Sequence, residues 1–71
     1  MRFEAGKTYK VYDKGTVTVV KRSAHYVTLS GLVDGRFMVN QGKLYRENEY
    51  VILPANTRGF KWFCIADDFC D

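Results

Sequence analysis

Apolar and polar residues alternate along most of the chain with a period of two, and glycine, asparagine and aspartate interrupt the pattern at short intervals. This pattern is typical of short β-strands joined by tight turns. No stretch shows the 3.6-residue apolar spacing of an amphipathic helix. We therefore predict an all-β fold, with strands over residues 7–12, 16–22, 26–30, 36–39, 43–45, 49–53 and 60–65.

The turns between these strands are marked by residues that accept unusual backbone conformations. Asp13-Lys14-Gly15 predicts a tight turn, because glycine takes the positive φ that a strand reversal requires. Asp34-Gly35 lies between two apolar flanks and predicts a two-residue hairpin. A further turn is predicted at residues 40–42 and a loop at residues 56–59.

Of these segments, five or six are expected to form the strands of the final sheet. So many short strands in about 60 residues must shield their edges, and the usual solution is a small, partly open barrel. We predict an SH3-like barrel of five or six antiparallel strands, with an OB-like barrel as the alternative. Residues 1–66 are expected to form this single domain, and residues 67–71 an acidic C-terminal tail that is disordered or forms one helical turn. The predicted core consists of inward apolar strand residues: Tyr9, Val11, Val17, Val19, Val27, Leu29, Phe37, Val39, Ile52, Trp62 and Cys64.

Length and composition limit the class of protein. With 71 residues, of which 46% are hydrophobic, the chain suffices for one core and is too short for a second. Its longest apolar run, residues 50–55, is far shorter than the about 20 residues that cross a bilayer, and the N-terminal residues lack the apolar run of a signal peptide. We expect a cytoplasmic protein without membrane contact, with Cys64 and Cys70 reduced.

The side chains that catalysis or metal binding requires are scarce. The one histidine, His25, lies in a predicted turn with no aspartate nearby in sequence to orient its ring. Gly6-Lys7-Thr8 resembles the end of a phosphate-binding loop, but the upstream glycine and the following helix are missing. Cys64 and Cys70 lack the spacing of a zinc site. We expect no enzyme, no cofactor and no metal.

The charge distribution favours nucleic acid as a partner. Residues 1–66 hold 11 basic and 5 acidic side chains, a net charge of +6, against +3 for the whole chain. Small barrels bind nucleic acid with cationic side chains for the phosphates and exposed aromatic rings for the bases. The candidate binding residues are basic or aromatic and lie in the predicted strands and turns: Lys10, Tyr12, Lys21, Arg22, Tyr26, Arg36, Lys43, Arg46 and Lys61.

The aromatic content supports a second class of function. Five Phe, five Tyr and one Trp exceed what a core of this size needs, so some of these rings are expected on the surface. Exposed aromatic residues favour protein interfaces, and open strand edges accept an added strand. A protein-interaction module, or an inhibitor of a host factor, is therefore the alternative function, and the chain is expected as a monomer or as a weak homodimer through its strand edges.

Four segments of the chain form a further pattern: Phe3-x-x-Gly6-Lys7-Thr8-Tyr9, the run from Val17 to Ser23, Tyr26-Val27-Thr28-Leu29, and Glu49-Tyr50-Val51-Ile52. Together they resemble a set of short proteins from phages, plasmids and integrative elements of Firmicutes. The resemblance implies a compact β fold in a mobile-element setting, and it implies no activity. The sequence thus predicts a non-enzymatic binding module, with weak nucleic-acid binding through its basic strand faces as the first hypothesis.

Overall fold

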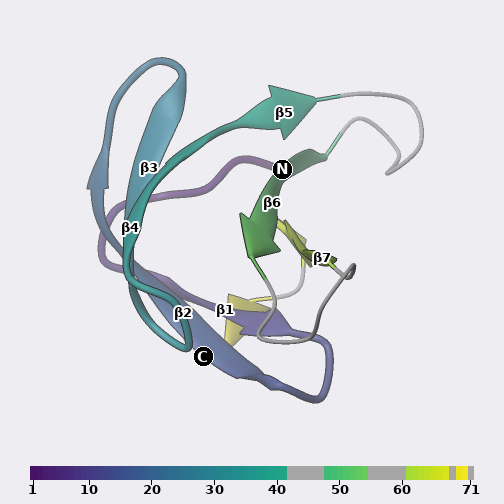
Figure 1. The fold of residues 1–71 in the computed structure, drawn as a ribbon. Coiled ribbons are helices and arrows are strands. Elements are labelled where there is room, and N and C mark those ends of the chain that lie inside the picture. Colours follow the sequence, from purple (N-terminus) through teal and green to yellow (C-terminus); the bar gives the residue numbers. More distant parts are fainter. Residues whose placement is uncertain (42–47, 55–60, 68, 71) are drawn as a thin grey trace.

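The computed structural model describes residues 1–41, 48–54, 61–67 and 69–70, which contain eight strands and no helix. The strands are β1 (Thr8–Val11), β2 (Gly15–Arg22), β3 (Tyr26–Gly31), β4 (Gly35–Met38), β5 (Asn40–Gln41), β6 (Glu49–Pro54), β7 (Lys61–Ile65) and β8 (Phe69–Cys70). They form two antiparallel sheets (Figure 1). The larger sheet has the order β4-β3-β2-β1-β8, and the smaller sheet has the order β5-β6-β7.

The all-β prediction is confirmed, and the strand count in the described residues is higher than the predicted five or six. The two sheets pack against each other through contacts of β1 with β7 and of β4 with β6. The described strands do not close into a single barrel, because no ladder of backbone hydrogen bonds joins the two sheets. The smaller sheet therefore lies beside the curved larger one (Figure 1).

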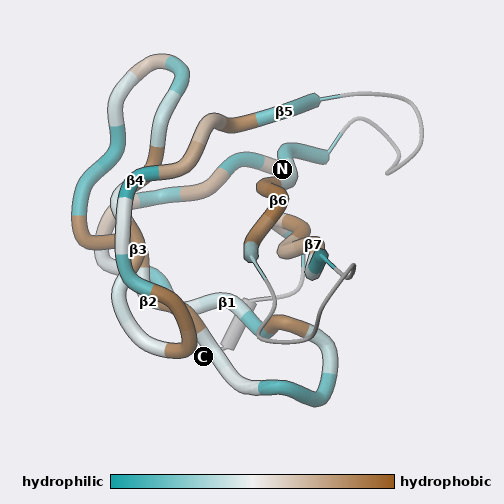
Figure 2. Tube along the Cα trace, viewed as in Figure 1, coloured by the Kyte–Doolittle hydropathy of each residue, from teal (hydrophilic) through white to brown (hydrophobic). Residues whose placement is uncertain are grey.

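The hydrophobic core lies between the sheets. Its buried members come from the N-terminal segment and from both sheets: Phe3, Tyr9, Val11, Val17, Val19, Val27, Leu29, Val51, Leu53, Cys64 and Ala66. Seven of the eleven predicted core residues are in this set, and Phe37, Val39 and Trp62 are partly buried against it. Figure 2 shows that β6 and β7 are mostly apolar and lie beside the larger sheet.

Ile52 is the exception among the predicted core residues, since it is 40% exposed. In β6 the buried residues are Glu49, Val51 and Leu53, so Ile52 points to the outer face. The run from Tyr50 to Leu53 is apolar throughout, and alternation cannot select its inner face. A shift of the alternation by one residue exchanges the two faces of a strand, so the prediction placed Ile52 in the core in place of Val51 and Leu53.

The predicted hairpin at Asp34-Gly35 is wrong in its register. Leu29 pairs with Gly35, so the connection spans residues 30–34 and is longer than two residues. Gly31 instead continues β3 and pairs with Val17 of β2. The Asp34 side chain closes the connection, because its Oδ1 accepts a hydrogen bond from the Gly31 N–H at 3.2 Å.

The other turn predictions have mixed outcomes. Lys14 N–H donates to the Val11 carbonyl at 2.9 Å, which confirms the turn before Gly15, although Tyr12 also has a positive φ of 50° there. Asn40 and Gln41 form β5, so the turn predicted there is wrong for these two residues, and Gly42 lies outside the described residues. The predicted strand at residues 43–45 and loop at 56–59 lie outside the described residues.

The C-terminal segment also differs from expectation. Disorder or a helical turn was predicted after residue 66, whereas Phe69 and Cys70 form β8 and pair with β1. The register joins Tyr9 to Phe69 and Thr8 to Cys70. β8 thereby extends the larger sheet beyond β1 through backbone hydrogen bonds. The pattern of apolar residues does not predict such pairing.

Gly31 is a position where the fold requires glycine. Its φ is +131°, and an added Cβ would lie 2.6 Å from the carbonyl oxygen of Thr16. Gly31→Ala is expected to lower the free energy of unfolding by about 3 kcal/mol through strain and this backbone clash. Gly35→Ala is the matched control, since its φ is +140° and its nearest contact is a Phe37 ring carbon at 3.7 Å. Urea unfolding should show a loss of about 1 kcal/mol for Gly35→Ala. Equal losses for the two variants would contradict the close approach of Gly31 to Thr16 where β3 pairs with β2.

Candidate nucleic-acid interface

A β-bulge in β2 determines which way its basic residues point. Val19 pairs with Leu29, and Lys21 pairs with Thr28, so Val20 is an extra residue without a partner in β3. A bulge of this kind shifts the alternation of the strand by one position. Lys21 is therefore exposed on the outer face, whereas Arg22 turns inward opposite the buried Val27.

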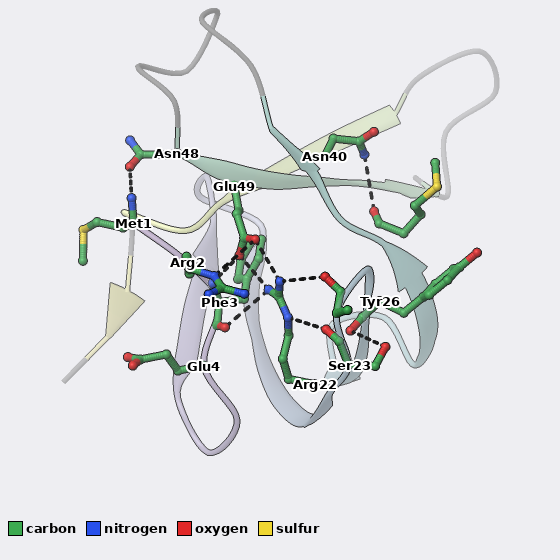
Figure 3. A network of polar contacts seen from close by, with 12 residues as sticks. Met1, Arg2, Phe3, Glu4, Arg22, Ser23, Tyr26, Asn40, Asn48 and Glu49 are labelled. Carbon is green, nitrogen blue, oxygen red and sulfur yellow. Dashed lines mark hydrogen bonds and ion pairs between the residues drawn. The ribbon is translucent and has the colours of Figure 1, made fainter.

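Arg22 forms an ion pair with Glu49 of β6 across the gap between the sheets (Figure 3). Its Nη1 and Nη2 donate to the two carboxylate oxygens of Glu49 at 2.6 and 2.8 Å. The Phe3 N–H donates to Glu49 Oε1 at 2.9 Å, and Arg2 Nε lies 3.7 Å from Oε2. Since the Arg22 and Glu49 side chains are only 13% and 9% exposed, this network joins the N-terminal segment, β2 and β6 away from bulk water.

The environment of Glu49 has two opposed effects on its pKa. Burial raises the pKa, because it disfavours the charged carboxylate. The hydrogen bonds from Arg22 and Phe3, together with the positive charges of Arg22 and Arg2, outweigh burial and hold the pKa of Glu49 below its ordinary value. Glu49 is thus ionised at neutral pH and compensates the charge of Arg22.

This lowered pKa predicts a loss of stability in acid. A group whose pKa is lower in the folded state stabilises the fold above its ordinary pKa, about 4.3 for glutamate, and this contribution is lost as the pH falls through the folded value. Urea unfolding at a series of pH values should show the difference in stability between the wild type and Glu49→Gln shrinking below about pH 4. A difference that stays constant down to pH 2 would show that the pKa of Glu49 is the same in the folded and unfolded states, which would contradict the lowered value.

The outer face of the larger sheet brings together three of the candidate residues, Lys21, Tyr26 and Arg36. Lys21 and Arg36 lie in one row across β2, β3 and β4, with Thr28 between them. The guanidinium carbon of Arg36 lies 4.2 Å from the centre of the Tyr26 ring, in a cation–π contact. Figure 3 shows the Tyr26 side chain directed away from the Arg22–Glu49 pair. A surface hollow of about 270 Å³ is lined by Lys21, Arg22, Ser23, Tyr26, Thr28 and Arg36.

The charge of this face is of one sign. Strands β1 to β4 contain four basic residues and no acidic residue. Within the described part of the chain, no carboxylate lies within ion-pair distance of Lys21 or Arg36. Arg22 is compensated by Glu49, so the uncompensated charge of these strands comes from Lys10, Lys21 and Arg36. The exposed Thr16 and the half-buried Thr28 lie on the same face as these cations and add hydroxyl hydrogen-bond donors.

The remaining candidate residues are distributed over the molecule. Lys10 shares the outer face with Lys21, opposite Thr16, and is about 15 Å away along the strands. Tyr12 is exposed in the turn that follows β1. Lys61 is exposed on the smaller sheet, opposite Pro54, and does not belong to this face. Arg22 points inward, and Lys43 and Arg46 lie outside the described residues.

Sequence reasoning missed two features of the site. Thr28 and Ser23 line the hollow but carry no charge or aromatic ring that would single them out. The split between Lys21 and Arg22 was also missed, since the two residues are adjacent and equally basic. The only signal for the split is that strict alternation from Val17 and Val19 would turn the charged Lys21 inward, and the bulge at Val20 turns it outward instead.

Comparison with known proteins found no family model, no curated protein and no solved structure that matches this chain. The resemblance to short proteins of Firmicutes mobile elements therefore stays a prediction. In the described part of the chain, no helix has the length and hydrophobicity needed to cross a membrane. The interface is thus interpreted from its own geometry and charge.

Proposed function

We propose that this chain is a non-enzymatic nucleic-acid-binding module and that its contact surface is the outer face of the larger sheet. The observation that carries the proposal is the row of Lys21, Thr28 and Arg36 beside the exposed ring of Tyr26, on strands with no acidic residue. Cations without acidic partners attract a polyanion, and contact with phosphates releases the counterions that surround it.

Each residue of the row has a chemical role in this proposal. Lys21 supplies a compact charge to one phosphate, and the planar guanidinium of Arg36 can donate two parallel hydrogen bonds to another. The Thr28 hydroxyl lies between them in the row and donates to the backbone of the ligand. Lys10 extends the basic track toward the other end of the sheet.

The test is a fluorescence-anisotropy titration of the whole chain with labelled oligonucleotides at about 50 and 200 mM salt. We expect dissociation constants in the micromolar range at the lower salt concentration and a marked weakening at the higher one. Absence of binding at low salt would overturn the proposal, because the attraction of three uncompensated cations for a polyanion is strongest under that condition.

The proposal includes the finer description of the fold. We infer an SH3-like arrangement, with an OB-like one as the alternative, because β2 bends at its bulge and the two sheets contact each other both through β1 and β7 and through β4 and β6. An experimental structure that describes the connection between β5 and β6 would distinguish them. The proposed setting, the bacterial cytoplasm and the products of mobile elements, rests on the sequence patterns alone.

A protein-interaction module is the second candidate, and the outer face of the smaller sheet favours it. Tyr50, Ile52, Phe63 and Ile65 share that face, and Ile52 is exposed among them. Here the proposed partner is a second copy of the chain. Sedimentation velocity at increasing concentration should then show association that Ile52→Asp abolishes, whereas Ile52→Asp should leave oligonucleotide binding unchanged. A monomer at every concentration would overturn this candidate.

A further inference from the structure

We propose that the ligand of this face is a single-stranded nucleic acid and that one unpaired base stacks on the Tyr26 ring, next to the Arg36 guanidinium. This inference rests on the proposed function and names its ligand class. Three observations support the inference: the position of Tyr26, the exposed apolar side chains near it, and the width of the larger sheet.

Tyr26 is held in place by its own turn and by Arg36. The Ser23 N–H donates to the Tyr26 carbonyl at 2.9 Å, which fixes the start of β3. The Arg36 guanidinium lies over the ring at 4.2 Å, yet the residue stays 38% exposed. The guanidinium covers one face of the ring, so the base would stack on the exposed remainder of this Arg36–Tyr26 pair.

Apolar surface next to the cations also favours a base over a bare phosphate. Met38 pairs with Tyr26 across β3 and β4 and is 56% exposed on the same face. The bulged Val20 is exposed as well and precedes Lys21 in β2. A site for phosphate alone gains nothing from these side chains, whereas a stacked base buries apolar area against them. The hollow and the exposed apolar side chains near it therefore offer both contacts that a nucleotide needs.

The shape of the face argues against a duplex. Strands β1 to β4 present a surface about 14 Å wide between the outer strand axes, from three spacings of about 4.8 Å. The major groove of B-DNA, about 12 Å wide, admits an α-helix or a two-stranded ribbon, not a sheet of this width. Bases within a duplex are also stacked on each other, so Tyr26 can reach only an unpaired one.

The experiment compares three labelled probes at about 50 mM salt: a 12-nucleotide oligothymidine, an abasic strand of equal length and a 12-base-pair duplex. We expect the oligothymidine to bind the wild type most tightly. Tyr26→Ala should weaken oligothymidine binding about tenfold and leave abasic binding within about twofold of the wild type. Tyr26→Phe, which keeps the ring, should retain the wild-type affinity, and Tyr12→Ala is the control for an exposed tyrosine outside the hollow.

The outcomes separate this inference from the function on which it rests. Equal affinity for all three probes, with Tyr26→Ala without effect, would overturn base stacking and leave phosphate binding intact. An equal loss for oligothymidine and the abasic strand in Tyr26→Ala would also overturn it, because the ring would then act only by positioning Arg36. If no probe binds the wild type at this salt concentration, the proposed function itself fails.

Discussion

Reversing the charge of Lys21 and Arg36 together, in Lys21→Glu with Arg36→Glu, is expected to weaken oligonucleotide binding by at least about tenfold at about 50 mM salt. The variant replaces both cations of the row on the outer face by carboxylates, which repel phosphate. Because each phosphate contact with a single strand contributes about 0.7 to the slope of log Kd against log salt, that slope should become shallower by about 1.4. Anisotropy titrations at several salt concentrations measure both quantities.

The matched control changes the net charge by the same amount elsewhere. Lys14→Glu with Lys61→Glu alters two exposed lysines, one in the turn before β2 and one in the smaller sheet. We expect a weakening of no more than about threefold, since only the long-range field changes. Equal losses for the two double variants would show that net charge, and not the row, governs binding.

Glu49→Gln is expected to lower the free energy of unfolding by about 3 kcal/mol, because it leaves the Arg22 guanidinium largely buried without a counter-charge. A domain of 71 residues has a total stability of about 4 to 10 kcal/mol, so this loss is a large part of it. Urea unfolding monitored by the fluorescence of Trp62 measures the change.

Glu4→Gln is the control for this substitution. Glu4 and Lys7 also form an ion pair at 2.6 Å, but both side chains are at least half exposed. An exposed pair contributes little, so we expect no measurable change in stability. A loss at Glu4 as large as that at Glu49 would contradict the assignment of the effect to burial.

The double variant Arg22→Met with Glu49→Leu tests the physical reason. If the cost of Glu49→Gln is that of an uncompensated buried charge, removing both charges restores most of the lost stability. Arg22 also lines the hollow, but both of its terminal nitrogens donate to Glu49, so the variant is expected to keep most of its oligonucleotide affinity. A large drop in affinity with the fold intact would show that Arg22 contacts the ligand.

Alternation predicts the larger sheet well. β1, β2 and β3 were found because Tyr9, Val17 and Leu29 alternate with polar residues, and one face of each strand is buried. It fails where the pattern is uniform, as in β6, where Val51 is buried and Ile52 is exposed although both are apolar. It also fails for β8, since a strand of two residues carries no period.

The candidate interface could be predicted only in part. Lys21, Tyr26 and Arg36 were singled out by charge and ring, but their meeting in one hollow depends on the registers of β2, β3 and β4. The register of β2 changes at Val20, and this one bulge separates the roles of the adjacent Lys21 and Arg22. Residue type predicted the chemistry, whereas pairing between strands determined which residues share a face.

The most direct test of the binding face is an NMR titration of the ¹⁵N-labelled chain with a short oligothymidine. We expect the largest shifts of the backbone amides at Lys21, Thr28 and Arg36, smaller shifts at Lys10, and none at Val51 in the inner face of β6. Such a pattern would place the ligand on the outer face of the larger sheet. Shifts confined to β6 and β7, or spread evenly over the molecule, would contradict it.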